Sequence, residues 1–61
     1  MRPFKIKCEK RRDGLRISRL EYDVKGAQFV AAAVEVPFND VRRAMSDPQV
    51  IGKLKLVRDG G

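Results

Sequence analysis

Residues 27–37 read AQFVAAAVEVP, the sustained apolar run of this chain, and lead directly into FNDVRRAM at residues 38–45. An apolar run that ends at a proline and continues as a short helical pattern is typical of a strand followed by its covering helix. We therefore expect residues 27–37 to form the central strand of a small sheet. A helix over the alanine-rich part stays open as an alternative, because short apolar runs discriminate poorly between the two. The extended geometry preferred by Val36 before Pro37 favours the strand.

This strand has two faces, because successive side chains point to opposite sides of a sheet. We expect the β-branched set to face the covering helix and the other set to lie on the more open face. The first set consists of Val30, Ala32, Val34 and Val36, and the second of Phe29, Ala31, Ala33 and Glu35.

The segment from Phe4 to Glu9 alternates strictly between apolar and charged residues, which predicts a strand with one solvated face. Phe4, Ile6 and Cys8 occupy its inward positions. Asp13-Gly14 follows after three cations and predicts a tight hairpin turn, since both central residues of such turns need positive φ.

The return strand runs from Leu15 to about Val24, and its apolar positions change parity along the way. Leu15 and Ile17 are odd, whereas Leu20, Tyr22 and Val24 are even. A strand cannot turn both sets to one face without an extra residue, so we expect a β-bulge near Ser18-Arg19. Lys25-Gly26 then predicts the next turn.

The last third of the chain predicts one short helix and a closing strand. Asn39 is a suitable N-cap, and Phe38, Val41, Ala44 and Met45 share one helical stripe. Asp47-Pro48 interrupts that helix, with room for one further turn before Gly52. Residues 53–58 alternate again and predict a strand with Leu54 and Leu56 inward. The expected fold is α+β: a small, mostly antiparallel sheet of three to four strands (β-β-β-α-β) with one short helix on one face.

Length and composition limit what this fold can do. Sixty-one residues make a single domain, residues 1–61, with a small core and marginal stability. A single cysteine and no histidine exclude an internal disulfide and a zinc site of the Cys/His type. We therefore expect a partner to supply the missing stability. No signal-peptide core or membrane-spanning run is present, which favours a soluble protein of a reducing compartment.

The sequence predicts no enzyme, no cofactor and no metal centre. Its carboxylates are scattered singly over predicted turns and solvated faces, and Ser18 and Ser46 lack a neighbouring base. Gly14, Gly26 and Gly52 belong to separate turns and form no phosphate-binding loop. Cys8 lies at an inward strand position, so we expect a small buried side chain and no reactive thiol.

Basic residues are the positive functional signal. Fourteen lysines and arginines against eight acidic residues give a net charge of +6, so we expect an acidic partner. If the first and last strands are close, their cations and the hairpin tip share one surface, with Phe29 as a hydrophobic anchor or a stacking platform for bases. The candidate partner-binding residues are Arg2, Lys5, Lys7, Lys10, Arg11, Arg12, Phe29, Lys53, Lys55 and Arg58.

The chain resembles the small basic linker polypeptides of phycobilisomes, of the core-linker and rod-capping type. The resemblance rests on Met1-Arg2 followed by Phe4-Lys5-Ile6, on Val36-Pro37-Phe38 opening a helix with Arg42 and Arg43, and on Gly52-Lys53-Leu54. It implies a non-enzymatic protein in the hollow of a phycobiliprotein disc, where basic side chains meet acidic subunits and adjust the bilin surroundings. Asp47-Pro48 and Ile51-Gly52 depart from the longer helix and paired glycine of that family.

Two functional alternatives remain open at this point. The same cations suit a nucleic-acid-binding or transcription-associated regulatory protein, although no nucleic-acid motif is matched. Size and charge also suit a small phage-type inhibitor of a host enzyme. The leading expectation is a small basic linker or interaction module that docks on an acidic protein assembly, in the cytoplasm or, if the linker resemblance holds, in the plastid stroma.

Overall fold

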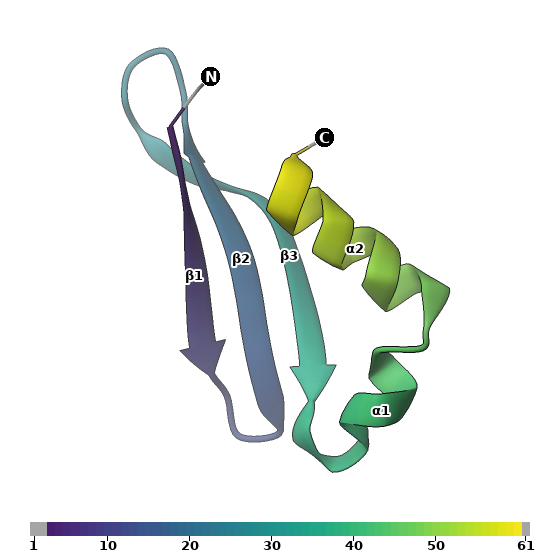
Figure 1. The fold of residues 1–61 in the computed structure, drawn as a ribbon. Helices are drawn as coiled ribbons and strands as arrows, with labels where there is room; N and C mark the ends of the chain where they lie inside the picture. Colours follow the sequence, from purple (N-terminus) through teal and green to yellow (C-terminus); the bar gives the residue numbers. More distant parts are fainter. Residues whose placement is uncertain (1–2, 61) are drawn as a thin grey trace.

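Three antiparallel strands precede the helices in the computed structural model, which describes residues 3–60 (Figure 1). β1 spans Phe4–Lys10, β2 spans Gly14–Tyr22 and β3 spans Gln28–Pro37. The strands form one open sheet in the order β1-β2-β3, so β2 and not β3 is central. The α+β class is confirmed. Arg2, one of the predicted partner-binding residues, lies outside the described residues.

The helical part follows β3 as two short pieces and one longer helix. A 3₁₀ turn, η1, spans Phe38–Asp40, α1 spans Val41–Ala44 and α2 spans Pro48–Asp59. The expected closing strand over residues 53–58 is therefore wrong, and so is the turn ending at Gly52, which lies inside α2. In the short helix only Ala44 of the predicted stripe is buried.

Local signals explain why α2 is a helix. The Asp47 carboxylate accepts a hydrogen bond of 2.9 Å from the Gln49 N–H, and Pro48 occupies the first turn. At the other end Gly60 has a φ of 85°, and its N–H donates to the Leu56 carbonyl at 2.9 Å. Between these caps Val50, Leu54 and Val57 recur at helical spacing, and Val57 is buried.

The first hairpin forms where it was predicted, but with a different turn. β1 ends at Lys10 and β2 begins at Gly14, with the Arg11 N–H donating to the Gly14 carbonyl at 2.7 Å. Positive φ among the described residues occurs at Gly26 and Gly60, not at Gly14. Gly14 is needed for space instead, because a Cβ there would collide with the Val36 carbonyl of β3.

The turn between β2 and β3 confirms the expectation for Lys25-Gly26. Gly26 has a φ of 85°, a region that glycine enters without strain. The Asp23 carboxylate accepts from the N–H groups of Lys25 and Ala27, both at 2.8 Å, and fixes the turn as an Asx motif.

A bulge lies near the predicted position, but the prediction that the return strand carries it is wrong, because the extra residue is on β3. β2 alternates without interruption, so Leu20 lies on the face opposite that of Ile17. The β2–β3 register shifts between Arg19 and Leu20, where Ala31 has no partner, while β1 and β2 pair without interruption. By this register Val30 lies opposite Leu20, on the face away from α2, and Phe29 lies opposite Glu21, on the face that carries α2. The expected assignment of these two side chains is therefore reversed, because the bulge changes parity within β3.

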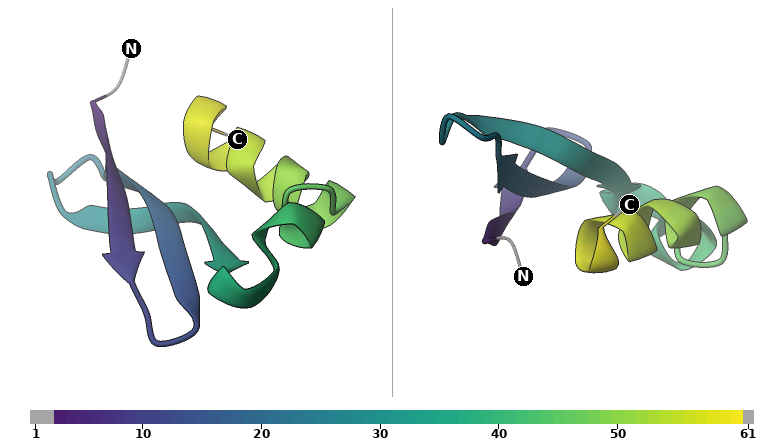
Figure 2. Two further views of the ribbon diagram at one scale, coloured as in Figure 1. Left: turned by 60° about the horizontal axis from the view of Figure 1, so that its bottom comes forward. Right: turned by 90° about the horizontal axis from the view of Figure 1, so that it is seen from above.

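The core is small and lies under α2. Its buried apolar residues are Val34 and Val36 of β3, Ala44 of α1 and Val57 of α2. α2 packs mainly on β3 and reaches β2 (Figure 2). Since one helix is narrower than three strands, this arrangement covers only part of the sheet.

Candidate protein-interaction surface

The face of the sheet that carries α2 is covered only in part. Phe4, Ile6 and Cys8 of β1 point to this face, because they lie opposite Glu21, Arg19 and Ile17 of β2. Phe4 is 37% exposed and Ile6 is 46% exposed, and Cys8 is exposed as well. We call these three side chains the β1 stripe. The expectation that Cys8 is buried is wrong, because α2 packs mainly on β3 and leaves this part of β1 uncovered.

Arg19 marks the boundary between the covered and uncovered parts of this face. Its side chain is 10% exposed, and its guanidinium donates to the carbonyls of Val57 and Arg58 at 3.1 and 3.0 Å. It also donates to the Glu21 carboxylate at 3.1 Å and lies 3.7 Å from the centroid of the Phe4 ring. One cation thus joins the C-terminus of α2 to the sheet and supports Phe4 from beneath. The sequence-based reasoning gave Arg19 no such role.

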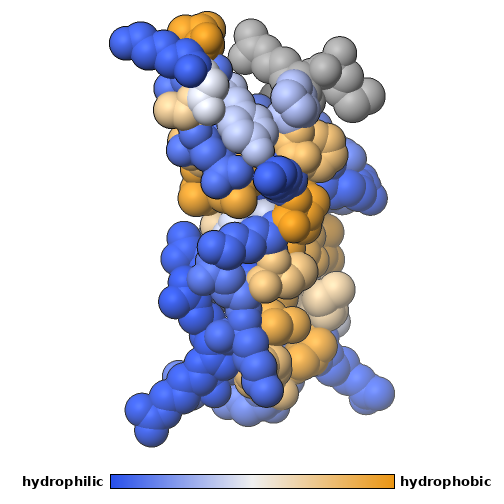
Figure 3. Space-filling view, turned by 90° about the vertical axis from the view of Figure 1, so that its left-hand side faces the viewer, coloured by the Kyte–Doolittle hydropathy of each residue, from blue (hydrophilic) through white to orange (hydrophobic). Residues whose placement is uncertain are grey.

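Two lysines lie on the face of β1 opposite the β1 stripe. Lys5 and Lys7 alternate with the stripe and therefore point to the opposite face. Lys7 lies 3.8 Å from Glu9, and the same carboxylate lies 3.3 Å from Arg11. Figure 3, which looks onto the β1 side, shows apolar side chains running along the molecule beside charged ones. Exposed ion pairs of this kind contribute little to stability, so these cations remain free to meet a partner.

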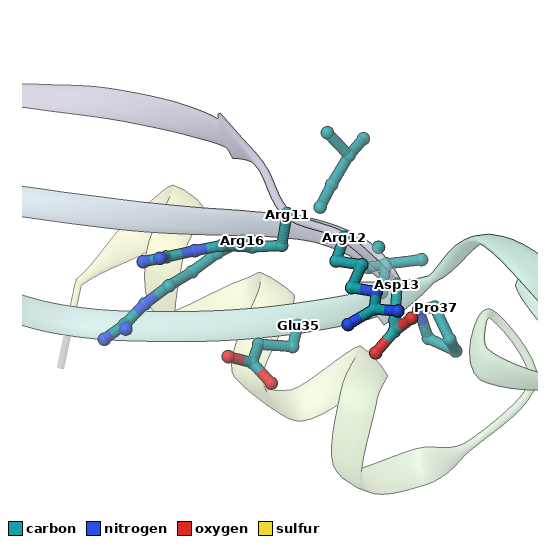
Figure 4. Close-up of a pocket in the computed structure, with 9 residues that line it drawn as sticks. Arg11, Arg12, Asp13, Arg16, Glu35 and Pro37 are labelled. Carbon is teal, nitrogen blue, oxygen red and sulfur yellow. The ribbon is translucent and has the colours of Figure 1, made fainter.

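The hairpin end carries a hollow of about 630 Å³. Its lining includes Arg11, Arg12 and Arg16 together with the carboxylates of Asp13 and Glu35. Figure 4 shows the side chains of Arg11 and Arg16 extending in the same direction from the hairpin. The two acidic groups offset part of the positive charge, so the hollow carries charges of both signs and is not purely cationic.

The predicted basic surface forms only in part. Lys5, Lys7 and Arg11 are neighbours on β1 and its turn, with Lys10 and Arg12 at the same end of the hairpin. The other predicted cations, Lys53, Lys55 and Arg58, belong to α2. This helix lies over β3 on the face of the sheet opposite Lys5 and Lys7, so its cations do not join those of β1 on one surface, as the cations of two neighbouring strands could have done. Lys53 reaches the edge of β3, where it lines a second hollow with Arg16 and Glu35.

Phe29 is not at the centre of the cations. It is 47% exposed and lies on β3, two strands away from Lys5 and Lys7. The exposed aromatic residue on the strand of Lys5 and Lys7 is instead Phe4, which was expected to be inward. Strand alternation identified the face of Phe4, Ile6 and Cys8 correctly, and only the extent of the helical cover decided that this face is open.

The end of α2 carries one perturbed ion pair. The Arg58 guanidinium donates two hydrogen bonds of 2.8 Å to the Asp59 carboxylate. These hydrogen bonds are the main reason that the pKa of Asp59 is lowered and the pKa of Arg58 is raised. Both groups are exposed, so the pair has a structural effect at the helix end and no sheltered chemistry. Arg58 is thereby engaged within its own helix.

Across residues 3–60 no three Cys, Asp or Glu side chains gather in a group that could hold a metal ion. None of the helices described is long and apolar enough to cross a membrane. Comparison with family models, curated proteins and solved structures gives no match for this chain.

Proposed function

We propose that this chain is a small basic, non-enzymatic binding module that docks on an acidic protein surface. The observation that carries the proposal is the β1 stripe, an exposed apolar strip on one face of an edge strand whose other face carries Lys5 and Lys7. An apolar centre with a charged rim is the composition of protein–protein interfaces. The net charge of +6 selects acidic partners by long-range attraction.

The overall dimensions support a surface that needs a partner. The chain exposes 5022 Å², whereas a compact monomer of 6.9 kDa exposes about 4000 Å² by size scaling. Its radius of gyration of 12.6 Å also exceeds the value of about 10 Å for a compact chain of this length. The excess of roughly 1000 Å² is comparable to one side of a standard protein–protein interface, about 800 Å².

The sharpest form of this proposal is a phycobilisome-type linker, as the sequence resemblance implies. It is tested by adding the protein to purified phycobiliprotein trimers and following bilin absorption and fluorescence. Binding with a spectral shift for the wild type, and loss of both for Ile6→Asp, is the expected result. Val24→Asp is the matched control, because Val24 is 98% exposed and lies in the loop outside the stripe.

The broader proposal does not depend on phycobiliproteins. Proteins captured from an extract of the producing cells by the wild type, but not by Ile6→Asp, are purified and titrated individually by fluorescence anisotropy. An acidic protein that binds the wild type with micromolar or tighter affinity and binds Ile6→Asp at least about tenfold more weakly supports the proposal. Failure of every captured protein to rebind, with Ile6→Asp correctly folded, contradicts it.

Nucleic-acid binding is the second candidate, favoured by the arginines of the hairpin hollow. It is tested by anisotropy titrations with labelled single- and double-stranded oligonucleotides at two salt concentrations. Phosphate binding weakens log-linearly with salt, whereas an apolar interface is less sensitive. Micromolar binding that disappears in an Arg11→Gln, Arg12→Gln variant and persists in Ile6→Asp would replace the protein-docking proposal with this one.

A further inference from the structure

The free edge of β1 also exposes backbone hydrogen-bonding groups. Within the described sheet β1 pairs only with β2, so the backbone N–H and C=O groups along its other side have no partner strand. β1 is seven residues long, contains no proline and pairs with β2 in unbroken register. The opposite edge of the sheet differs, because β3 carries the bulge at Ala31 and ends in Pro37, with the helices beside it (Figure 1).

The two faces of β1 set the chemistry of a strand that would pair there. On one face such a strand meets Phe4, Ile6 and Cys8, which require apolar neighbours. On the other face it meets Lys5, Lys7 and Glu9. Glu9 is already paired with Lys7 and Arg11, so this face keeps an excess of positive charge and requires acidic neighbours. Because side chains alternate along a strand, one extended segment satisfies both faces if its residues are alternately apolar and acidic.

We infer that the acidic partner adds such a segment, alternately apolar and acidic, to the free edge of β1 as a fourth strand of the sheet. This inference rests on the proposed docking function and specifies how docking occurs. Backbone hydrogen bonds supply affinity, and the alternation supplies specificity. Lys5 and Lys7 also reject strands without acidic residues, which protects the bare edge from indiscriminate pairing.

A second copy of this chain is a poorer occupant of the edge. Antiparallel self-pairing centred on Ile6 matches the apolar residues best, but it places Lys5 of each copy opposite Lys7 of the other. Each copy also brings a net charge of +6. Like charges directly opposite one another destabilise a strand pair, so an acidic strand is preferred.

The probe is a fluorescently labelled peptide VEVEVEV, of the same length as β1. The control peptide has the same composition in blocks, VVVVEEE, and cannot present glutamate and valine to opposite faces of a strand. The wild type is expected to bind the alternating peptide at least about tenfold more tightly than the block peptide. Equal binding of the two peptides overturns the inference.

Charge reversal gives a gain-of-function test. Lys5→Glu with Lys7→Glu is expected to weaken VEVEVEV binding at least about tenfold and to create binding of VKVKVKV. Lys53→Glu with Lys55→Glu makes the same charge change on α2 and should leave the preference for VEVEVEV intact. If both double variants weaken binding equally, the peptide binds through the net charge of the protein and not through β1, which contradicts the inference.

Amide hydrogen exchange reports directly on the backbone pairing. Alternate N–H groups of residues 4–10 are expected to exchange more slowly when the peptide, or a captured acidic protein, is bound. A captured protein that loses binding with Ile6→Asp but protects no alternating β1 amides overturns the fourth strand and leaves the docking function standing. Absence of any acidic protein partner removes the docking function itself. A concentration-dependent dimer in sedimentation that protects the same amides assigns the edge to a second copy.

Discussion

Arg19 holds the sheet and α2 together through contacts with three parts of the chain. It satisfies two carbonyls at the end of α2, pairs with Glu21 and lies beneath the Phe4 ring. Only four apolar residues are buried in the described chain, so a buried polar junction carries an unusually large share of the stability. The guanidinium is suited to this position because it donates in several directions from one plane.

Replacing Arg19 by methionine is expected to destabilise the protein by about 2–3 kcal/mol, because two helix carbonyls and Glu21 lose a charged donor. Since a domain of this size has a stability of at most about 3–5 kcal/mol, the variant should keep about 0–3 kcal/mol and unfold at a much lower urea concentration. Urea unfolding followed by far-ultraviolet circular dichroism measures the change. Arg16→Met is the control, as Arg16 makes no such contacts with α2, and it should cost less than about 1 kcal/mol. Equal losses in the two variants would contradict the role of Arg19.

Gly14 shows a second constraint at the residue scale. A methyl group at this position would meet the Val36 carbonyl, so Gly14→Ala must push β2 and β3 apart. The expected cost is about 1–3 kcal/mol, as for other overpacked sites. Comparing the thermal unfolding of Gly14→Ala with that of Gly26→Ala separates steric crowding from backbone strain. A side chain at Gly26 would meet open space, so only the positive φ of 85° makes a substitution there unfavourable. A larger loss at Gly26 would contradict this account.

At the scale of elements, the three strands and their turns could be predicted because their signals are local. Alternation fixed β1, and parity placed the bulge beside Arg19 without revealing that Ala31 supplies the extra residue. α2 could not be assigned from residues 53–56, where Lys-Leu-Lys-Leu alternates as a strand would. The caps at Asp47 and Gly60 and the spacing of Val50, Leu54 and Val57 were the better signal. Exposure of Phe4, Ile6 and Cys8 could not be predicted either, because it depends on how far α2 extends across the sheet.

A substitution at Gly52 tests whether the segment after Pro48 is a helix or an extended strand. Gly52 lies inside α2 with no atoms within 4 Å of the space a side chain would occupy. Gly52→Ala is therefore expected to stabilise the protein by about 0.5–1 kcal/mol, because alanine favours a helix interior. Asp47→Ala should destabilise it by about 1 kcal/mol through loss of the N-cap. Urea midpoints of both variants test the pair, and a destabilised Gly52→Ala would contradict the helix.

At the scale of the whole molecule, the chain is flat and strongly positive. Its principal extents are 39, 23 and 12 Å. Fourteen lysines and arginines in a chain of this size must lie close to one another on average. Mutual repulsion of an excess of six positive charges favours the unfolded chain. In the proposed complex an acidic partner would reduce this repulsion and cover the β1 stripe at the same time.

Salt should therefore stabilise the isolated protein. Raising sodium chloride from low to roughly physiological strength shortens the Debye length to about 8 Å, which screens repulsion across the sheet. We expect the Tm from circular dichroism to rise by a few degrees, on the order of 0.5–1 kcal/mol. The Lys10→Gln, Arg12→Gln variant, with a smaller net charge, should respond less. A Tm that falls with salt would mean that attractive ion pairs outweigh repulsion.

The unpaired Ala31 also gives β3 one residue more than β2 can match. Strand pairs on either side of it are complete, so excising this alanine leaves a continuous ladder and shortens the chain without removing a partner from any other residue. Phe29 and Val30 would keep their faces, since Val30 would still lie opposite Leu20 and Phe29 opposite Glu21. Related chains that are shorter by a single residue should therefore lack it here, with the order of the aromatic and aliphatic positions before it unchanged.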